Sequence, residues 1–243
     1  MNKIFLTAQW RNLIMANYAV DPALLLPYLP AYTELDYYDG KCYVSLVGFM
    51  FKQVKIKGIS IPFHTNFPEV NLRLYVKHTA ADGSVQRGVV FISEIVPKIA
   101  IAWVANNIYR EKYLATTMNY SHHQSEKEQR FDYSWKWKGK NNLISASVQH
   151  ALAPIQDNTE EAFIFEHYYG FAKVNAGVTN QYTVEHPSWN THTVDAYTVD
   201  CDFEKCYGSQ FAFLDRATPA SVFVAAGSAV AIREKTVLKK EKS

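Results

Sequence analysis

Polar and aliphatic residues alternate strictly in the stretch Glu69-Val70-Asn71-Leu72-Arg73-Leu74-Tyr75-Val76. Successive side chains on a β-strand point to opposite faces, so one face would be entirely polar. That face would present Glu69, Asn71, Arg73 and Tyr75. Arg is a natural clamp for a carboxylate or phosphate, because its planar fork donates two parallel hydrogen bonds. Glu69 would hold the guanidinium or act as an acid or base. We interpret this face as one wall of a pocket for a small, anionic organic ligand.

The alternative for this face is an ion pair between Glu69 and Arg73 on an exposed strand, which would contribute about 0 to 1 kcal/mol. The face carries no Lys or Thr, as an ordinary wet face would, and this favours the pocket. A further acid, Glu94, is embedded in the apolar segment 91–96. If Glu94 lines the same cavity, the three charged residues form an acid/base cluster.

A second group of polar residues lies in Glu166-His167-Tyr168-Tyr169-Gly170-Phe171. The surrounding segment reads as an apolar strand, so burial should perturb Glu166 and His167 unless each has a partner. Neighbouring residues on a strand face opposite sides, so these two cannot act as an adjacent pair. One could face the cavity and bind ligand while the other is structural. The alternative is a core histidine with satisfied hydrogen bonds beside an interfacial glutamate.

Two lysines are weak candidates for a nucleophile. A Schiff-base lysine must be neutral, which requires burial or a neighbouring cation to depress its pKa. Lys112 follows Arg110, and Lys173 has apolar neighbours. For both, a surface lysine whose stem packs on apolar residues is the competing interpretation.

Other chemistries lack their sequence signatures. The chain has no GxSxG, GxGxxG or GxxxxGK[ST] motif, which counts against common hydrolases, dinucleotide enzymes and NTPases, and we expect no cofactor. The eight histidines show no metal-ligand spacing supported by nearby acids, so no metal site is expected. His186 is expected to form hydrogen bonds in a loop, and His122 and His123 to lie in a polar loop.

Composition indicates a folded, soluble protein. Hydrophobic residues make up 48% of the 243 residues, and the net charge is +2 with basic residues scattered along the chain. Nucleic acid and membrane are therefore poor candidate partners. The odd number of cysteines, three, and the lack of a CxxC pair indicate no disulfide framework. Polar residues follow Met1 too soon for a signal-peptide core, and no apolar run is long enough to span a bilayer. We expect a cytoplasmic location, and the oligomeric state, a homo-oligomer included, stays open.

The periodicity mostly predicts strands. We expect them at Ile4 to Trp10, Tyr43 to Lys55, Glu69 to Val76, Val89 to Ile95, Leu143 to His150, Phe163 to Val174, Gln181 to Glu185, Thr193 to Val199, Ser221 to Ala225 and Ala229 to Lys235. No repeat or linker is visible, which predicts a single domain over residues 1–243. Antiparallel strands with few helices, polar on one face and apolar on the other, predict a mainly β fold, an antiparallel barrel that encloses a cavity.

Helix signals are few. Asp21 is a good N-cap for a short helix through Leu26, and Asp202 for one that runs to Leu214, with Gly208 as a weak point. A helix is also expected from Lys98 to Tyr109. The polar segment from Ser121 to Arg130 is expected to be a loop, and the segment from Lys239 onward a frayed tail.

Several segments resemble the YqjF-like family of uncharacterised bacterial proteins. They are Trp10 to Tyr18, Tyr43 to Phe49, Glu69 to Val76, Arg87 to Phe91, Glu166 to Phe171, His186 to Trp189 and Pro219 to Phe223. The resemblance is collinear from about residue 4 to 235. It implies a fold related to acetoacetate decarboxylase, an antiparallel β-barrel or cone around a ligand cavity.

The resemblance does not extend to the decarboxylase's lysines. That enzyme relies on a Schiff-base lysine followed by a second lysine, in a Gly-x-Pro-Lys-Lys context. The nearest position in this chain is Lys112, which has neither the preceding proline nor the second lysine. We therefore expect a cavity that binds a small carboxylate-bearing molecule. An enzyme of the lyase or hydrolase type acting on an oxo acid, and a non-catalytic sensor or interaction protein, remain the alternatives.

Overall fold

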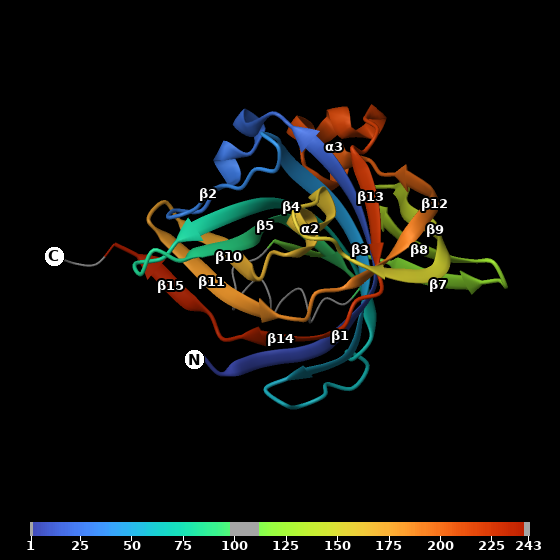
Figure 1. The fold of residues 1–243 in the computed structure, drawn as a ribbon, viewed down its shortest axis with the longest axis horizontal. Helices are drawn as coiled ribbons and strands as arrows, with labels where there is room; N and C mark the ends of the chain where they lie inside the picture. The colour runs from blue at the N-terminus through green and yellow to red at the C-terminus, as the bar shows by residue number, and fades with distance from the viewer. Residues whose placement is uncertain (1, 98–111, 241–243) are drawn as a thin grey trace.

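The computed structural model describes residues 2–97 and 112–240, and most of these lie in strands (Figure 1). The strands are β1 Ile4–Val20, β2 Glu34–Leu35, β3 Cys42–Ile56, β4 Phe67–Thr79, β5 Val85–Val96, β6 Tyr113–Ala115, β7 Met118–Gln124, β8 Glu128–Trp137, β9 Lys140–Pro154, β10 Tyr169–Asn175, β11 Val178–Glu185, β12 Asn190–Asp200, β13 Ser221–Ala225, β14 Ala229–Arg233 and β15 Thr236–Lys239. The helices are α2 Glu160–Phe165, α3 Phe203–Tyr207 and the 3-10 turns η1 Pro22–Leu24, η2 Leu26–Tyr28 and η3 Ser209–Arg216.

A ring of strands forms the left half of the molecule in Figure 1. Among the described residues its order is β1, β3, β4, β5, β10, β11 and β14, and β14 pairs back onto β1. All of these pairings are antiparallel except that of β5 with β10, which is parallel and joins Gly88 to Tyr169. The closed ring confirms the predicted mainly β fold around an interior. The parallel pair is a departure from a purely antiparallel barrel.

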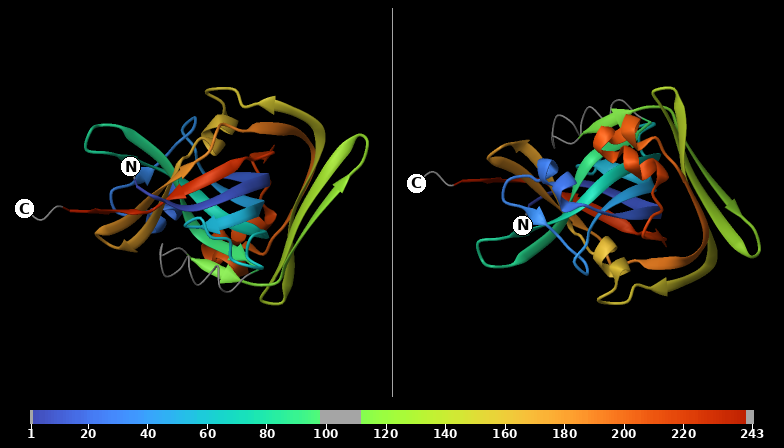
Figure 2. Two further views of the ribbon diagram at one scale, coloured as in Figure 1. Left: turned by 90° about the horizontal axis from the view of Figure 1, so that it is seen from below. Right: turned by 90° about the horizontal axis from the view of Figure 1, so that it is seen from above.

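A second group of strands continues the same sheet from β1 and forms a curved layer beside the ring, here called the wing. It contains β13, β12, β9, β8 and β7, and Figure 2 shows its green, yellow and orange strands standing apart from the blue and cyan strands of the ring. The first part of β1 pairs with β14 and its second part, from Leu13, pairs with β13. Asn12 lies at the change of partner, with a φ of 57°. β1 therefore belongs to both the ring and the wing.

Strands β3 and β4 are buried on both faces over most of their length. One face of β3 and β4, with Leu46, Leu72 and Leu74, packs against wing residues such as Tyr133. The other face points into the ring. Gly48 permits the close approach of the wing, because a Cβ there would lie 2.8 Å from the Tyr133 ring. Strand β4 therefore has one aliphatic face, which packs toward the wing, and a second face that points into the ring.

Both capping aspartates begin helical segments, as expected. The Asp21 carboxylate accepts from the Ala23 amide at 2.8 Å and precedes two 3-10 turns rather than an α-helix. Asp202 accepts from the Lys205 amide at 2.8 Å and begins α3. At Gly208, with a φ of 114°, α3 gives way to η3. The weak point expected at this glycine is where the helix changes type.

The prediction of one strand from Phe163 to Val174 is wrong in its first half. Thr159 caps α2 by accepting from the Ala162 amide at 3.1 Å, and two glutamates follow in the first turn, where the helix dipole favours them. Strand β10 begins only at Tyr169. His167 therefore lies in the connection between α2 and β10.

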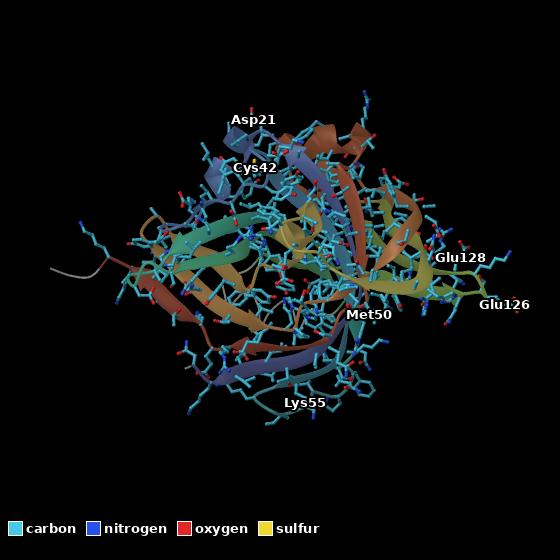
Figure 3. The ribbon with its side chains drawn as sticks, in the orientation of Figure 1. Asp21, Cys42, Met50, Lys55, Glu126 and Glu128 are labelled. Carbon is cyan, nitrogen blue, oxygen red and sulfur yellow. The ribbon has the colours of Figure 1, made fainter. Side chains whose placement is uncertain are left out.

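The loop expected from Ser121 to Arg130 is also wrong. β7 and β8 form a hairpin whose turn lies between Gln124 and Glu128, so His122 and His123 are on a strand. Figure 3 shows Glu126 and Glu128 at the far end of this hairpin. β7 is the last strand in the order of the described strands.

Two further expectations concern the C-terminal tail and the helix after β5. Lys239 is not part of a frayed tail, because it closes β15 opposite Val178. The helix expected from Lys98 to Tyr109 lies outside the described residues. Within the part of the chain that the structure describes, no helix has the length and apolar character required to cross a membrane.

Candidate functional site

The interior of the ring holds a cavity of about 70 Å³. One enclosed water needs roughly 10 to 15 Å³, so the space suits about five waters or one small organic molecule. Every strand of the ring contributes to its wall, through Leu13, Phe49, Asn71, Phe91, Gly170, Val184 and Ile232 among others. The polar and aromatic-polar side chains of the wall are Trp10, Glu69, Asn71, Arg73, Glu94, Tyr113, His167, Tyr169, Tyr182, His186 and Trp189.

β4 supplies three of these side chains through its alternation. Val70, Leu72 and Leu74 are fully buried in the layer between ring and wing. The intervening residues therefore face the ring interior, where Glu69 and Asn71 are each only 2% exposed. This burial makes the alternative of an ion pair on an exposed strand wrong.

A β-bulge in β5 directs Glu94 into the same cavity. Asn71 pairs with Glu94 and Arg73 pairs with Phe91, so two residues of β5 fill the space of one between them. Directly opposed residues of an antiparallel pair share a face. Without the bulge, strict alternation from Phe91 would turn Ser93 inward instead. The bulge thus brings Glu69, Arg73 and Glu94 to one cavity.

Glu69 is held by two donors within the cavity wall. Asn71 Nδ2 donates to Oε1 at 3.0 Å, and the Tyr113 hydroxyl donates to Oε2 at 3.1 Å. Burial raises the pKa of Glu69 to about 7, although both hydrogen bonds lower it. Burial and the charges of Glu69 and Glu94 raise the pKa of Tyr113 well above its usual range. A proton at neutral pH can therefore reside on Glu69.

Arg73 has only neutral neighbours for its guanidinium. Nη2 donates to the Ile164 carbonyl at 3.2 Å and approaches the Met15 sulfur at 3.5 Å. The guanidinium carbon lies 5.4 Å from the centre of the Tyr75 ring. Nε is buried and has no hydrogen-bond partner in the described part of the chain. The charge thus faces the cavity without an acid bound to it among residues 2–97 and 112–240.

His167 is oriented by an acid that the sequence did not single out. Its Nε2 lies 3.2 Å from Asp36 Oδ2, which also accepts from Arg87 Nε at 2.6 Å. Although burial raises the pKa of Asp36, hydrogen bonds from His167 and Arg87 and their charges lower it to about 2. Burial, with help from the charges of Arg87 and Arg73, lowers the pKa of His167 to about 4. At neutral pH the site holds a neutral imidazole beside an ionised carboxylate.

Several residues of the wall carry a buried polar atom with no hydrogen-bond partner among the described residues, and the following ones bear on the ligand. They are Trp10 Nε1, Asn71 Oδ1, Arg73 Nε and His167 Nδ1. Buried polar groups are nearly always hydrogen-bonded, and each exception requires an explanation. A cavity with two donors and two acceptors of this kind is suited to a small polar ligand.

Aromatic rings form another part of the wall. Trp10 packs edge-on against Phe49 at 5.3 Å between ring centres, and His186 stacks on Trp189 at 4.2 Å. His186 Nδ1 lies 2.9 Å from the Pro187 carbonyl oxygen, so it does form the expected local contact while also lining the cavity. Burial lowers the pKa of His186. These rings give the cavity an apolar surface beside its polar one.

The remaining predicted residues lie elsewhere. The Tyr75 hydroxyl is 2.6 Å from Ser45 Oγ in a buried network, outside the cavity wall. Glu166 ends α2, where it accepts from Ser188 at 2.9 Å and from Tyr168. Lys112 is exposed and lies 5.3 Å from the centre of the Tyr28 ring.

The two candidate lysines lie outside the described part of this wall. Lys173 is exposed, and its Nζ donates to the Pro27 carbonyl at 3.3 Å. No lysine is among the described residues that line the cavity. The described residues also contain no group of three His, Cys, Asp or Glu side chains that could hold a metal ion.

Sequence reasoning missed Asp36, Trp10 and Tyr113 as parts of the site. Asp36 lies 131 residues from His167 in the chain, and only the closed ring brings them together. Tyr113 comes from the short strand β6, which pairs in parallel with β5 at Glu94. The one local signal available was Trp10, a large aromatic between the polar residues Gln9 and Arg11 of β1.

A family model matches nearly the whole chain. It is DUF2071, described as an uncharacterized conserved protein, and the match covers residues 7–229. The uncharacterized protein YqjF of Bacillus subtilis (strain 168) is 33% identical over 75 residues, which are 30% of this chain and 31% of that relative. The match therefore spans less than a third of YqjF. These findings confirm the resemblance inferred from the sequence.

Solved structures of similar fold include two enzymes. The enduracididine biosynthesis enzyme MppR complexed with pyruvate has a TM-score of 0.67 and 14% identity, over 98% of this chain and 91% of that one. Acetoacetate decarboxylase from Legionella pneumophila has a TM-score of 0.64 and 12% identity, over 96% and 87% of the two chains. At these identities the likeness establishes the fold, which is acetoacetate-decarboxylase-like.

Proposed function

We propose, from the premise that this chain belongs to the DUF2071 family, that its ring cavity binds a small organic molecule bearing a carboxylate. Arg73 is the clamp for the carboxylate. Trp10 Nε1 supplies a second donor beside it, Asn71 Oδ1 can accept from another part of the ligand, and the rings of the aromatic wall cover the apolar part of the ligand.

The unpaired guanidinium of Arg73 is the observation that carries this proposal. Arg73 is half-buried and its Nε is fully buried, so a charge without a counter-ion is costly here, and an anionic ligand would offset that cost. The contacts that Arg73 makes to the Ile164 carbonyl and the Met15 sulfur are neutral and leave Nε unused. Charge-assisted hydrogen bonds from Arg to a carboxylate are about twice as strong as neutral ones.

The state of Glu69 supports an anionic ligand further. With a pKa of about 7, it is largely protonated in mildly acidic solution and then adds no negative charge beside the clamp. A protonated carboxyl can also donate a hydrogen bond to the ligand. The pyruvate complex of MppR supports a small oxo acid as a ligand that this fold can hold.

Arg73→Gln tests the clamp. We expect pyruvate and acetate to bind about 10- to 100-fold more weakly, because charge-assisted hydrogen bonds contribute about 1.5 to 3 kcal/mol each. Binding is measured by NMR titration of the purified protein. Arg216→Gln, an exposed arginine of η3, is the matched control and should bind like the wild type. Equal binding by the wild type and Arg73→Gln would reject the clamp.

A catalytic role on an oxo acid is the second candidate, and the pKa of Glu69 favours it. A general base works best when its pKa lies near the operating pH. Glu69, with Tyr113 and Glu94 beside it, could accept a proton from the carbon next to a ligand's carbonyl. The test is exchange of the pyruvate methyl protons in D2O, followed by NMR. Exchange that the wild type accelerates and Glu69→Gln does not would support this role, and no acceleration would remove it.

The third interpretation, a non-catalytic sensor, would be favoured by Glu69 and Arg73 facing bulk solvent beside an apolar cavity. Both residues line the cavity itself. The geometry therefore gives the sensor interpretation no specific support.

A further inference from the structure

We propose that the ligand carries a hydroxyl group next to its carboxylate, and that Nδ1 of His167 accepts the hydrogen bond from that hydroxyl. This inference rests on the proposed carboxylate binding and narrows the ligand to a small hydroxy acid. It makes His167 a residue that determines specificity.

The tautomer of His167 is set by its neighbours. Asp36 Oδ2 lies 3.2 Å from Nε2, and the same oxygen accepts from Arg87 while Oδ1 accepts from the Tyr37 amide at 3.0 Å. A carboxylate held in this way is an acceptor only, so Nε2 must carry the proton. Nδ1 of a neutral ring then carries a lone pair and is itself an acceptor.

The ring of His167 has no freedom to turn Nδ1 toward another partner. It packs against the Tyr75 ring at 4.8 Å and edge-on against the Phe163 ring at 5.1 Å, and its side chain is 1% exposed. Nδ1 is buried and has no hydrogen-bond partner in the described chain, while the residue lines the cavity. A ligand in the cavity is therefore the natural source of the donor that Nδ1 lacks.

Asn71 adds a second acceptor to the same cavity. Its Nδ2 donates to Glu69, which leaves Oδ1 as an acceptor without a partner among the described residues. A carboxylate offers only acceptors and can satisfy Arg73 and Trp10, but neither acceptor. A ligand that matches the whole set must bring both a carboxylate and a donor.

The donor is a hydroxyl rather than an ammonium group because of the charge around His167. Two guanidiniums lie near this ring, because Arg73 lines the same cavity and Arg87 donates to Asp36, whereas Asp36 is the one carboxylate bonded to the ring among the described residues, so a cationic donor next to Arg73 would be repelled. A neutral hydroxyl supplies the hydrogen bond without that repulsion.

Lactate and propionate form the test pair, since they differ only by the hydroxyl. Both enantiomers of lactate are titrated by NMR against the wild-type protein, with alanine as the ammonium analogue. We expect one enantiomer of lactate to bind about three- to tenfold more tightly than propionate, as one neutral hydrogen bond allows. His167→Phe should abolish this preference, so that lactate and propionate bind to the variant with equal affinity. His167→Asn, whose Oδ1 can take the place of Nδ1, should restore part of it.

Two further measurements keep the test decisive if His167→Phe does not fold. Asp36→Asn can donate to Nε2 and shift the ring proton to Nδ1, and it should lose the preference for lactate. The nitrogen chemical shifts of His167 should show an Nε2-protonated ring whose Nδ1 signal moves with lactate and not with propionate.

Each outcome has a distinct meaning. Equal binding of lactate and propionate to the wild type, tighter binding of alanine, or a preference that survives in His167→Phe overturns this inference alone. If neither lactate nor propionate binds, the proposed function fails and this inference fails with it. Arg73→Gln separates the two proposals, because it should weaken lactate and propionate by the same factor.

Discussion

Burial shifts the pKa values of Glu69 and His167 in opposite directions, and in both residues it favours the neutral form. It raises the pKa of the carboxyl to about 7 and lowers that of the imidazole to about 4. In each case desolvation disfavours the charged form. Between these two values a protonated acid and an unprotonated base face the same cavity, which is an arrangement suited to proton transfer and to hydrogen bonds of either sense.

Glu69→Gln should change the pH dependence of stability. The folded-state pKa of Glu69 lies above its unfolded value, so its stability contribution is fully present below pH 4.5 and is lost as the pH rises through about 7. A shift from 4.5 to about 7 corresponds to about 3 kcal/mol. The free energy of unfolding of Glu69→Gln relative to wild type should therefore rise by about 3 kcal/mol between pH 4 and pH 8.

Urea unfolding at both pH values measures this difference. Glu126→Gln, an exposed residue at the tip of the β7–β8 hairpin (Figure 3), is the control and should show no such change. A difference between Glu69→Gln and wild type that is independent of pH would mean that Glu69 ionises normally.

At the scale of the element, the site divides into what a strand pattern predicts and what it does not. The inward row on β4 was predictable, because a strand of period two with one aliphatic face must place Glu69, Asn71 and Arg73 together. The direction of Glu94 was not, because a bulge changes the alternation and leaves no mark in a single sequence. His167 was predicted as a site residue although the element around it was wrong.

Strands β5 and β10 pair in parallel over a short stretch, and this pairing is part of the closed ring. The close approach of the two strands requires a glycine. A Cβ at Gly88 would lie 2.4 Å from the Tyr169 carbonyl oxygen, which belongs to backbone and cannot move aside easily. Gly88→Ala should therefore destabilise the fold by about 1 to 3 kcal/mol or more. The measurement is the midpoint and slope of urea unfolding.

Gly177 provides the matched substitution for this prediction. It lies between β10 and β11, and no atom lies within 4 Å of the position of its Cβ. Gly177→Ala should leave stability nearly unchanged. Similar effects of the two substitutions would show that the approach of β10 to β5 is not as close as described.

At the scale of the whole molecule, the ring and the wing share strands that are buried on both sides. Residues 42–51 of β3 are all buried, whereas residues 57–63 of the following hairpin are all exposed. The sequence predicted a mainly β fold and most of its strands. It could not predict which strands meet, because the pairings of β10 with β5 and of β14 with β1 join segments that are distant in the chain.

Amide hydrogen exchange should follow this layering. Exchange in the buried part of β3 and in β4 should require global unfolding and be the slowest in the chain, whereas residues 57–63 should exchange almost freely. Mass spectrometry of peptides after timed exposure to D2O resolves the two regions. Comparable protection of both would contradict the two-layer arrangement.

The pairing of β14 with β1 also has a consequence for biosynthesis. Ile4 pairs with Arg233, so the ring cannot close until the residues up to about 233 have left the ribosome. At about 5 to 20 residues per second, the edge of β1 stays without this partner for roughly 10 to 45 s. Unpaired strand edges are templates for association with other chains. This protein should therefore depend on chaperones during synthesis more than its finished fold would suggest.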